Sequence, residues 1–141
     1  MPTENESVNK GQVYIEKNKK MNLKVIDTEF SVCKVEDYSQ VDLNEEFVFT
    51  GHTDEELSLV CPTTLVPDNT TERNDGWKAF RIEGVLDFSL IGILSRISGV
   101  LADNAIGIFA ISTFNTDYIL TKECDFSKAF KVLEQAGYTI I

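Results

Sequence analysis

Residues 80–120 read FRIEGVLDFSLIGILSRISGVLADNAIGIFAISTFNTDYIL, and this stretch decides the fold. It opens with FRIE, in which apolar and charged residues alternate as in a half-buried β-strand. Apolar residues then recur at helical spacing from Leu90 to Leu101, which predicts a helix with one buried face. The segments 106–112 and 117–122 have the pattern of two strands joined by a tight turn. This part of the chain therefore predicts strand, helix, strand, strand.

The residues that follow complete the pattern. Asp125 is a suitable cap for a second helix, which Gly137 would end, and YTII at residues 138–141 has the composition of a short closing strand. Strand, helix, strand, strand, helix, strand is the ferredoxin-like βαββαβ order, and right-handed crossovers place both helices on one face of a four-stranded antiparallel sheet. We therefore expect an α+β domain over residues 76–141.

The preceding residues predict a smaller, strand-rich half over residues 21–70. Two alternating segments between residues 22 and 36 are separated by an Asp-Thr-Glu turn signal, and 46–51 and 56–61 flank a polar turn like the arms of a β-hairpin. By composition, PDNTTERND at 67–75 is a loop and the natural boundary between the halves. Residues 1–20 are lysine-rich and polar, and we expect them to be a mobile N-terminal extension.

A short internal repeat relates the two halves. FTGHTDEELSL from Phe49 matches STFNTDYILT from Ser112 at an offset of 63 residues, with both threonines and the aspartate aligned. The first half would then be a shortened copy of the second, without most of its first helix.

Composition narrows the function. The 141 residues carry a formal net charge of -10, which disfavours nucleic acid and anionic membranes as partners. The three cysteines are odd in number and lack CxxC spacing, which argues against disulfides and a zinc site. The first twenty residues lack the apolar stretch of a secretory signal, so we expect a cytoplasmic protein.

The run DFSLIGIL at 87–94, followed by FAISTFNTDYIL at 109–120, strongly resembles the small two-ACT proteins of bacteria. Those proteins are similar in sequence pattern to the regulatory ACT domains of aspartate kinases and to the animal cytosolic arginine sensor. TDEELSLVCP at 53–62 and GWKAFRIEG at 76–84 resemble the same family, so the likeness runs from about residue 23 to the end. The resemblance implies a ferredoxin-like ACT domain preceded by a shortened ACT-like half. It also implies a non-catalytic regulatory sensor that binds a free amino acid.

In proteins of this family, the ligand lies where the loop after the first strand of one unit meets the strand turn of a neighbouring unit. The matching positions in this sequence are Asp87, Phe88, Ser89, Gly92, Ile93, Thr113, Phe114 and Asp117. A helix beginning near Leu90 would offer backbone donors to a carboxylate, and Asp87 or Asp117 could pair with an ammonium group. Asn115 departs from the aspartate that is common in the family. If this position contacts the ligand side chain, the departure alters which ligand is preferred.

Each of these residues also has a plain structural interpretation. Asp87 and Ser89 are typical helix caps, Asp117 suits a strand turn, and Gly92 is equally suited to a packing role. No nucleophile with a neighbouring base, phosphate loop or metal motif is evident, so no catalytic residue, metal ligand or cofactor is predicted. A homodimer is expected, because the short first half would leave sheet edges that a second copy could cover. The alternative is a module that kept the ACT shape for protein interaction and lost the pocket.

Overall fold

The structure is a computed structural model that describes residues 21–83 and 92–141. The chain divides into two compact units. Unit 1 contains the described residues 21–26, 80–83 and 92–141, and unit 2 consists of Asp27–Ala79. Two long strands, β1 (Asn22–Val35) and β4 (Thr70–Ile82), contribute residues to both units. Each unit is described on its own below.

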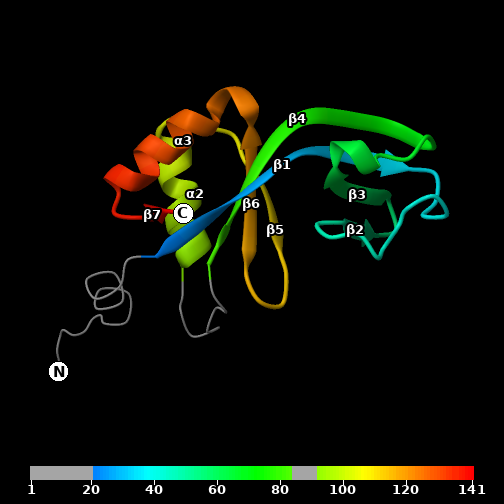
Figure 1. Ribbon diagram of the computed structural model, residues 1–141, viewed down its shortest axis with the longest axis horizontal. Helices are drawn as coiled ribbons and strands as arrows, with labels where there is room; N and C mark the ends of the chain where they lie inside the picture. Colours follow the sequence, from blue (N-terminus) through cyan, green and yellow to red (C-terminus); the bar gives the residue numbers. More distant parts are fainter. Residues whose placement is uncertain (1–20, 84–91) are drawn as a thin grey trace. The chain divides into compact units, whose positions relative to one another are not determined.

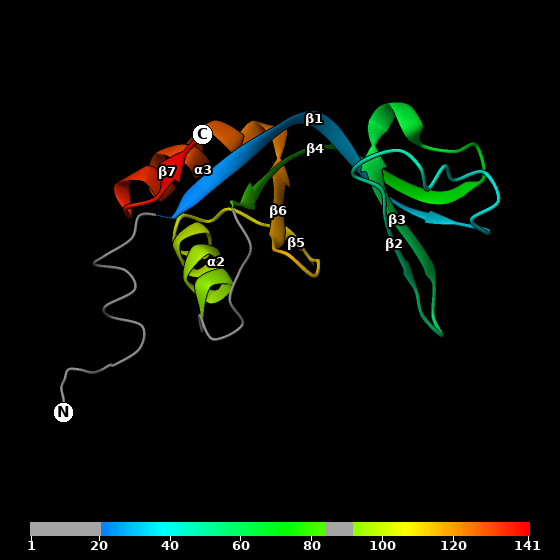
Figure 2. The same cartoon turned by 60° about the horizontal axis from the view of Figure 1, so that its bottom comes forward.

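Unit 1 has the ferredoxin-like order of elements. The end of β4 is followed by α2 (Ile93–Asp103), β5 (Phe109–Ser112), β6 (Asp117–Lys122), α3 (Glu123–Gln135) and β7 (Thr139–Ile140). The two helices lie side by side (Figures 1 and 2). The predicted ferredoxin-like fold class is therefore confirmed for this unit.

The sheet of unit 1 contains one strand more than the four expected. Its order is β7-β1-β4-β6-β5, so the first residues of β1 lie between the first and last strands of the βαββαβ order. The pairing of β1 with β7 is parallel, with Asn22 opposite Thr139 and Leu23 opposite Ile140. The sequence gives no local sign of this pairing, because parallel partners can be far apart along the chain.

The core of unit 1 is formed where the helices cover the sheet. In α2 the buried side chains are Ile93, Ile97 and Leu101, spaced four residues apart along one face. In α3 they are Ala129 and Leu133. The cluster is completed by strand and loop residues, namely Leu23, Phe80, Ile82, Ile106 and Ile119.

Both helices begin at residues other than those expected. The helix α2 begins at Ile93, three residues after Leu90, with Gly92 at its N-cap. Gly92 has φ of 82°, a left-handed conformation that glycine adopts without steric cost. The helix α3 begins at Glu123 with Lys122 as its N-cap, so Asp125 lies in its first turn and does not cap it. An acidic residue is also favourable in the first turn, because it faces the positive end of the helix dipole.

Unit 2 contains the hairpin of β2 (Phe49–His52) and β3 (Leu57–Pro62), the short 3-10 helix η1 (Thr63–Leu65), and parts of β1 and β4. Its strand order is β2-β3-β1-β4. Two predictions were wrong here. Residues 22–35 form one strand with no turn at Asp-Thr-Glu, a triplet that lacks glycine and proline. The predicted loop at 67–75 is largely β4, and its polar composition reflects strand residues 71–75 that are exposed.

The hairpins of the two units are equivalent, but at an offset of 60 residues and not 63. The strands β2 and β5 share the same length and burial pattern, and so do β3 and β6. The turn bond from Thr53 N to Glu56 O recurs from Thr113 N to Thr116 O. The structural equivalent of Thr53 is therefore Thr113. The alignment at 63 arose because each hairpin carries two threonines three residues apart, which lets the sequences slide by that distance.

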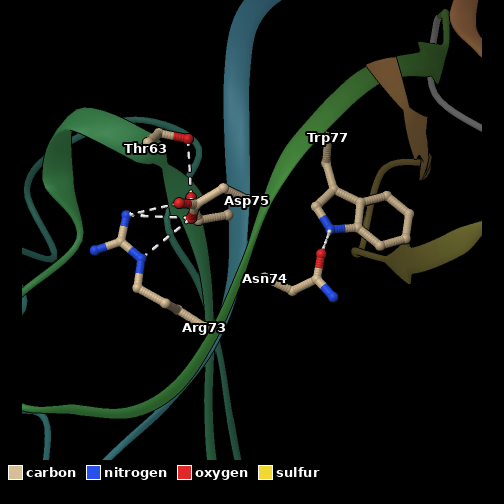
Figure 3. A network of polar contacts seen from close by, with 6 residues as sticks. Thr63, Arg73, Asn74, Asp75 and Trp77 are labelled. Carbon is tan, nitrogen blue, oxygen red and sulfur yellow. Dashed lines mark hydrogen bonds and ion pairs between the residues drawn. The ribbon is translucent and has the colours of Figure 1, made fainter. Parts of the chain in front are cut away.

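Unit 2 combines a small apolar cluster with a polar network. The buried members of the cluster are Cys33, Val35, Leu59 and Cys61. In the network, the fully buried Ser31 hydroxyl donates a 2.6 Å hydrogen bond to Asp75 and also bonds the hydroxyl of Thr63. Figure 3 shows Arg73 directed at the same carboxylate, at 3.1 Å, while Trp77 donates to Asn74 on the other side of the strand.

Candidate ligand-binding site

A pocket of about 420 Å³ lies in unit 1, where the end of β4 meets the turn between β5 and β6. Its volume falls in the range of small-molecule sites. The described residues that line it are Arg81, Ile82, Glu83, Thr113, Phe114, Asn115, Thr116 and Tyr118. The pocket therefore joins two segments about thirty residues apart in the sequence.

Arg81 is the cationic group of this pocket. Its Nη1 donates to the hydroxyl of Tyr118 at 3.2 Å, and its guanidinium carbon lies 5.9 Å from the centre of the Tyr118 ring. Its Nε donates to Glu83 Oε1 at 3.4 Å. The hydrogen bond to Tyr118 raises the pKa of Arg81 above its ordinary value, so the guanidinium stays charged. A fixed positive charge and a carboxylate thus lie next to each other.

Hydrogen bonds hold the opposite wall of the pocket, the turn 113–116. The Thr113 N–H and hydroxyl both donate to Thr116 O, at 2.8 and 2.9 Å. The Thr116 hydroxyl, which is buried, donates to Ile82 O at 2.6 Å. This last bond ties the turn to β4. The hydroxyl protons of both threonines are therefore used within the protein.

The structure brings together only part of the set of ligand residues predicted from the sequence. Thr113 and Phe114 line the pocket, and Phe114 is 82% exposed. Asp117 is the first residue of β6, is half-buried, and pairs with Ser112. Gly92 and Ile93 begin α2, and the side chain of Ile93 is buried in the core. Those last three residues are not among the described residues that line the pocket.

Three of the predicted ligand residues, Asp87, Phe88 and Ser89, lie outside the described residues. They belong to the segment that follows Glu83 in the chain and precedes Gly92.

Arg81, Glu83 and Tyr118 were not predicted to be site residues. The sequence did contain a signal for the first two, since residues two apart on a strand point to the same face. Opposite charges at that spacing can be a solvated pair or a site for a zwitterion. The distinction depends on Tyr118 and the turn, which only the fold brings close.

Among the residues that the structure describes, no group of histidine, cysteine and carboxylate side chains could hold a metal ion. Within the same ranges, no helix is both long and apolar enough to cross a bilayer.

Comparison with known proteins supports the fold. Residues 72–135 match the ACT domain family. A crystal structure from Agobacterium tumefaciens is similar with a TM-score of 0.77 and 28% identity, over 87% of this chain and 93% of that one. Among curated proteins, none matches the chain closely enough to count as a relative.

Two more distant structures share the fold. A C-terminal regulatory domain of aspartate kinase from Porphyromonas gingivalis has a TM-score of 0.51 and 15% identity, over 85% of this chain and 97% of that one. The regulatory subunit of aspartate kinase from Thermus thermophilus has a TM-score of 0.53 and 8% identity, over 84% and 94% of the two chains. The sequence match over residues 72–135 and the βαββαβ order agree on an ACT-type fold, which is also the fold of the aspartate kinase regulatory domains.

Proposed function

We propose that the protein is a non-catalytic regulatory module that binds a free amino acid in the pocket of unit 1. The observation that carries the proposal is the adjacency of Arg81 and Glu83, which both line a pocket of suitable volume. An α-amino acid at neutral pH has one carboxylate and one ammonium group. A neighbouring guanidinium and carboxylate match both charges.

The ligand carboxylate would bind Arg81. A guanidinium has five N–H donors in a planar fork, and the described residues supply partners to two of its nitrogens, Nε and Nη1. The remaining donors suit a carboxylate, and charge-assisted bonds of this type contribute roughly 1.5–3 kcal/mol each when shielded from water. The ligand ammonium would bind Glu83, whose bond to Arg81 is long at 3.4 Å. In the proposed complex, the weak ion pair between Arg81 and Glu83 is replaced by two stronger ion pairs with the ligand.

The other predicted ligand residues belong to the same proposal. Asp87, Phe88 and Ser89 follow Glu83 in the chain, and Thr113 and Phe114 already line the pocket. Asp117 and the first turn of α2 would contribute from a neighbouring ACT unit, and a cytoplasmic homodimer would supply that unit. Ligand binding would then favour one arrangement of subunits, to the extent that its affinity differs between the two arrangements.

A thermal-shift screen against the twenty amino acids at millimolar concentration tests this function. A ligand present at 100 times its Kd stabilises the native protein by about 2.7 kcal/mol, which is an easily measured shift. Arg81→Gln should abolish the shift. Lys34→Gln is the matched control, because Lys34 pairs with Ser58, the equivalent of Tyr118 in the hairpin of unit 2. If no amino acid shifts the midpoint, or if Arg81→Gln leaves the shift intact, the proposed site is wrong.

A second candidate is a ligand-free interaction module. The observation that favours it is Phe114, an aromatic side chain 82% exposed at the tip of the β5–β6 hairpin. Exposed aromatic residues are frequent anchors in protein interfaces. Under this alternative, Phe114→Ser would abolish capture of a partner protein, and no amino acid would change the thermal midpoint of either variant.

A further inference from the structure

The charges of the chain are divided unevenly between the two units. Unit 2, residues 27–79, contains thirteen of the 23 acidic residues and three of the 13 basic ones, which gives it a formal charge of -10. The rest of the chain contains ten of each and is neutral overall. The entire net charge of the protein therefore belongs to unit 2. Such a unit attracts cations and repels anions over a distance of about one Debye length, roughly 8 Å at physiological ionic strength.

Unit 2 also contains a pocket of its own, of about 330 Å³. Its floor includes Leu59 and Cys61 on β3, which are both buried. Val41 and Val48 form one wall, and residues 64–68, from the end of η1 and the segment after it, form the other. The polar lining residues are Gln40, Asp42, Thr64 and Asp68.

Hydrogen bonds hold the walls of this pocket in place. The Asp68 N–H donates to Gln40 Oε1 at 3.2 Å and links the two walls. One oxygen of Asp42 accepts the Asn44 N–H at 2.9 Å, which fixes the loop that carries this carboxylate. Seven of the eleven lining residues are apolar and four are polar, a mixture that is usual for a small-molecule site.

We propose that this second pocket binds a small organic cation, namely a primary amine with a branched apolar body. The apolar floor and walls would receive the hydrocarbon part. The ammonium group would bind the carboxylates of Asp42 and Asp68, and the charge of the whole unit would favour its approach.

The lining also indicates which ligands are rejected. No lysine, arginine or histidine is among the described residues that line the pocket, so a ligand carboxylate would meet two acidic side chains and no cation. An α-amino acid is therefore disfavoured here, in contrast to the pocket of unit 1. The two pockets should discriminate between an amine and the corresponding amino acid.

Three probes with the same apolar body test the proposal: 3-methylbutylamine, 3-methylbutan-1-ol and leucine. Each is titrated into the full-length protein to millimolar concentration, and binding is followed by two-dimensional NMR of backbone amides. The amine should shift the amides of Leu59, Val48 and Val66, which line the pocket, and its affinity should fall as salt is raised. The alcohol and leucine should cause much smaller shifts at these amides.

Variants separate local contacts from the general charge of the unit. Replacing both carboxylates, Asp42→Asn with Asp68→Asn, should weaken amine binding at least about tenfold. Asp54→Asn with Glu55→Gln is the matched control, because it removes the same two charges from exposed acids of the same unit that do not line the pocket, and it should change the affinity less than about twofold.

Amide shifts elsewhere in the protein, equal binding of the alcohol, or equal effects of the control and pocket variants would each overturn the proposal. The NMR spectrum also shows whether every variant is folded. Because the pocket belongs to unit 2, failure here leaves the amino-acid site of unit 1 untouched.

Discussion

The two units of this protein contain the same hairpin, but the contacts that stabilise it differ. In both, a turn closed by threonine joins a four-residue strand to a six-residue strand, and the equivalent residues are 60 positions apart. In unit 1 the helices α2 and α3 enclose an apolar core next to this hairpin. Unit 2 has no α-helix in its described residues, which cover the whole unit, and relies on a smaller cluster and on the network around Ser31. The same backbone motif is thus stabilised mainly by apolar burial in one unit and partly by polar contacts in the other.

The charged residues next to the two hairpins also differ in their contacts. The sequence Arg-Ile-Glu at 81–83 has a counterpart in Lys-Val-Glu at 34–36. Arg81 contacts Tyr118, whereas Lys34 pairs across the strands with Ser58 and lies 4.0 Å from Glu72, in an exposed ion pair. Arginine with tyrosine makes a planar, fixed arrangement, and lysine with serine does not. This difference supports placing the proposed amino-acid site in unit 1.

The largest expected effect comes from the two cores. Ile119 and Leu59 occupy equivalent hairpin positions and are both buried. Ile119→Ala should reduce the free energy of unfolding by about 3–5 kcal/mol, because the cavity lies between the sheet and the helices. Leu59→Ala should cost less, about 2–3 kcal/mol, because its side chain borders an open pocket.

Two spectroscopic probes follow the units separately in this experiment. Helical circular dichroism reports on unit 1, and the fluorescence of Trp77, the single tryptophan, reports on unit 2. Chemical denaturation of both variants gives the two free energies. An equal or larger cost for Leu59→Ala would contradict the picture of a loosely enclosed core in unit 2.

A smaller difference is expected between the turns. Thr116→Val removes the buried 2.6 Å bond to Ile82 O and should cost about 1–3 kcal/mol. Thr53→Val removes only bonds to the exposed N–H groups of Glu55 and Glu56, which water can replace, so it should cost under about 1 kcal/mol. Urea unfolding of both variants measures the difference. Equal costs would show that the bond to β4 adds nothing beyond the turn itself.

The smallest expected effect depends on pH and involves unit 2. Burial raises the pKa of the Cys61 thiol to about 11 from an ordinary value of 9.0, and also raises that of Cys33. Because the unfolded chain releases these protons first, stability is complete below pH 9 and falls as the pH rises from 9 towards 11, by about 1–2 kcal/mol.

Trp77 fluorescence during denaturation at pH 8.5 and 10.5 measures this loss. Cys61→Ala should reduce the dependence on pH, whereas Cys124→Ala, at an exposed position, should leave it unchanged. A pH dependence that is the same in all three proteins would assign the loss to other groups.

The sequence predicted the elements with clear periodicity. The helix face of Ile93, Ile97 and Leu101 and the hairpin strands were identified because apolar spacing encodes them locally. It did not predict that β1 and β4 are long strands that belong to both units, since residues 27–29 of β1 and 71–75 of β4 are polar and mostly exposed. Composition there reflects contact with water and not the absence of a strand.

The site was predicted less completely for a related reason. Thr113 and Phe114 were found through resemblance, whereas Arg81 and Glu83 have the pattern of an ordinary solvated strand face. Their role depends on Tyr118, which is distant in the sequence. The contact between Arg81 and Tyr118 depends on tertiary structure, so it cannot be predicted from either segment of the sequence alone.

The pairing of β7 with β1 has a consequence for biosynthesis. Unit 1 contains both Leu23, which leaves the ribosome early, and Ile141, which leaves it late. The two residues are joined by a hydrogen bond from Ile141 N–H to Leu23 O at 2.8 Å. Unit 2 is an uninterrupted segment that is complete once residue 79 has emerged. During translation, therefore, the acidic unit 2 can fold before the last strand of unit 1 has emerged. An arrested nascent chain that ends shortly after β4 would contain unit 2 alone.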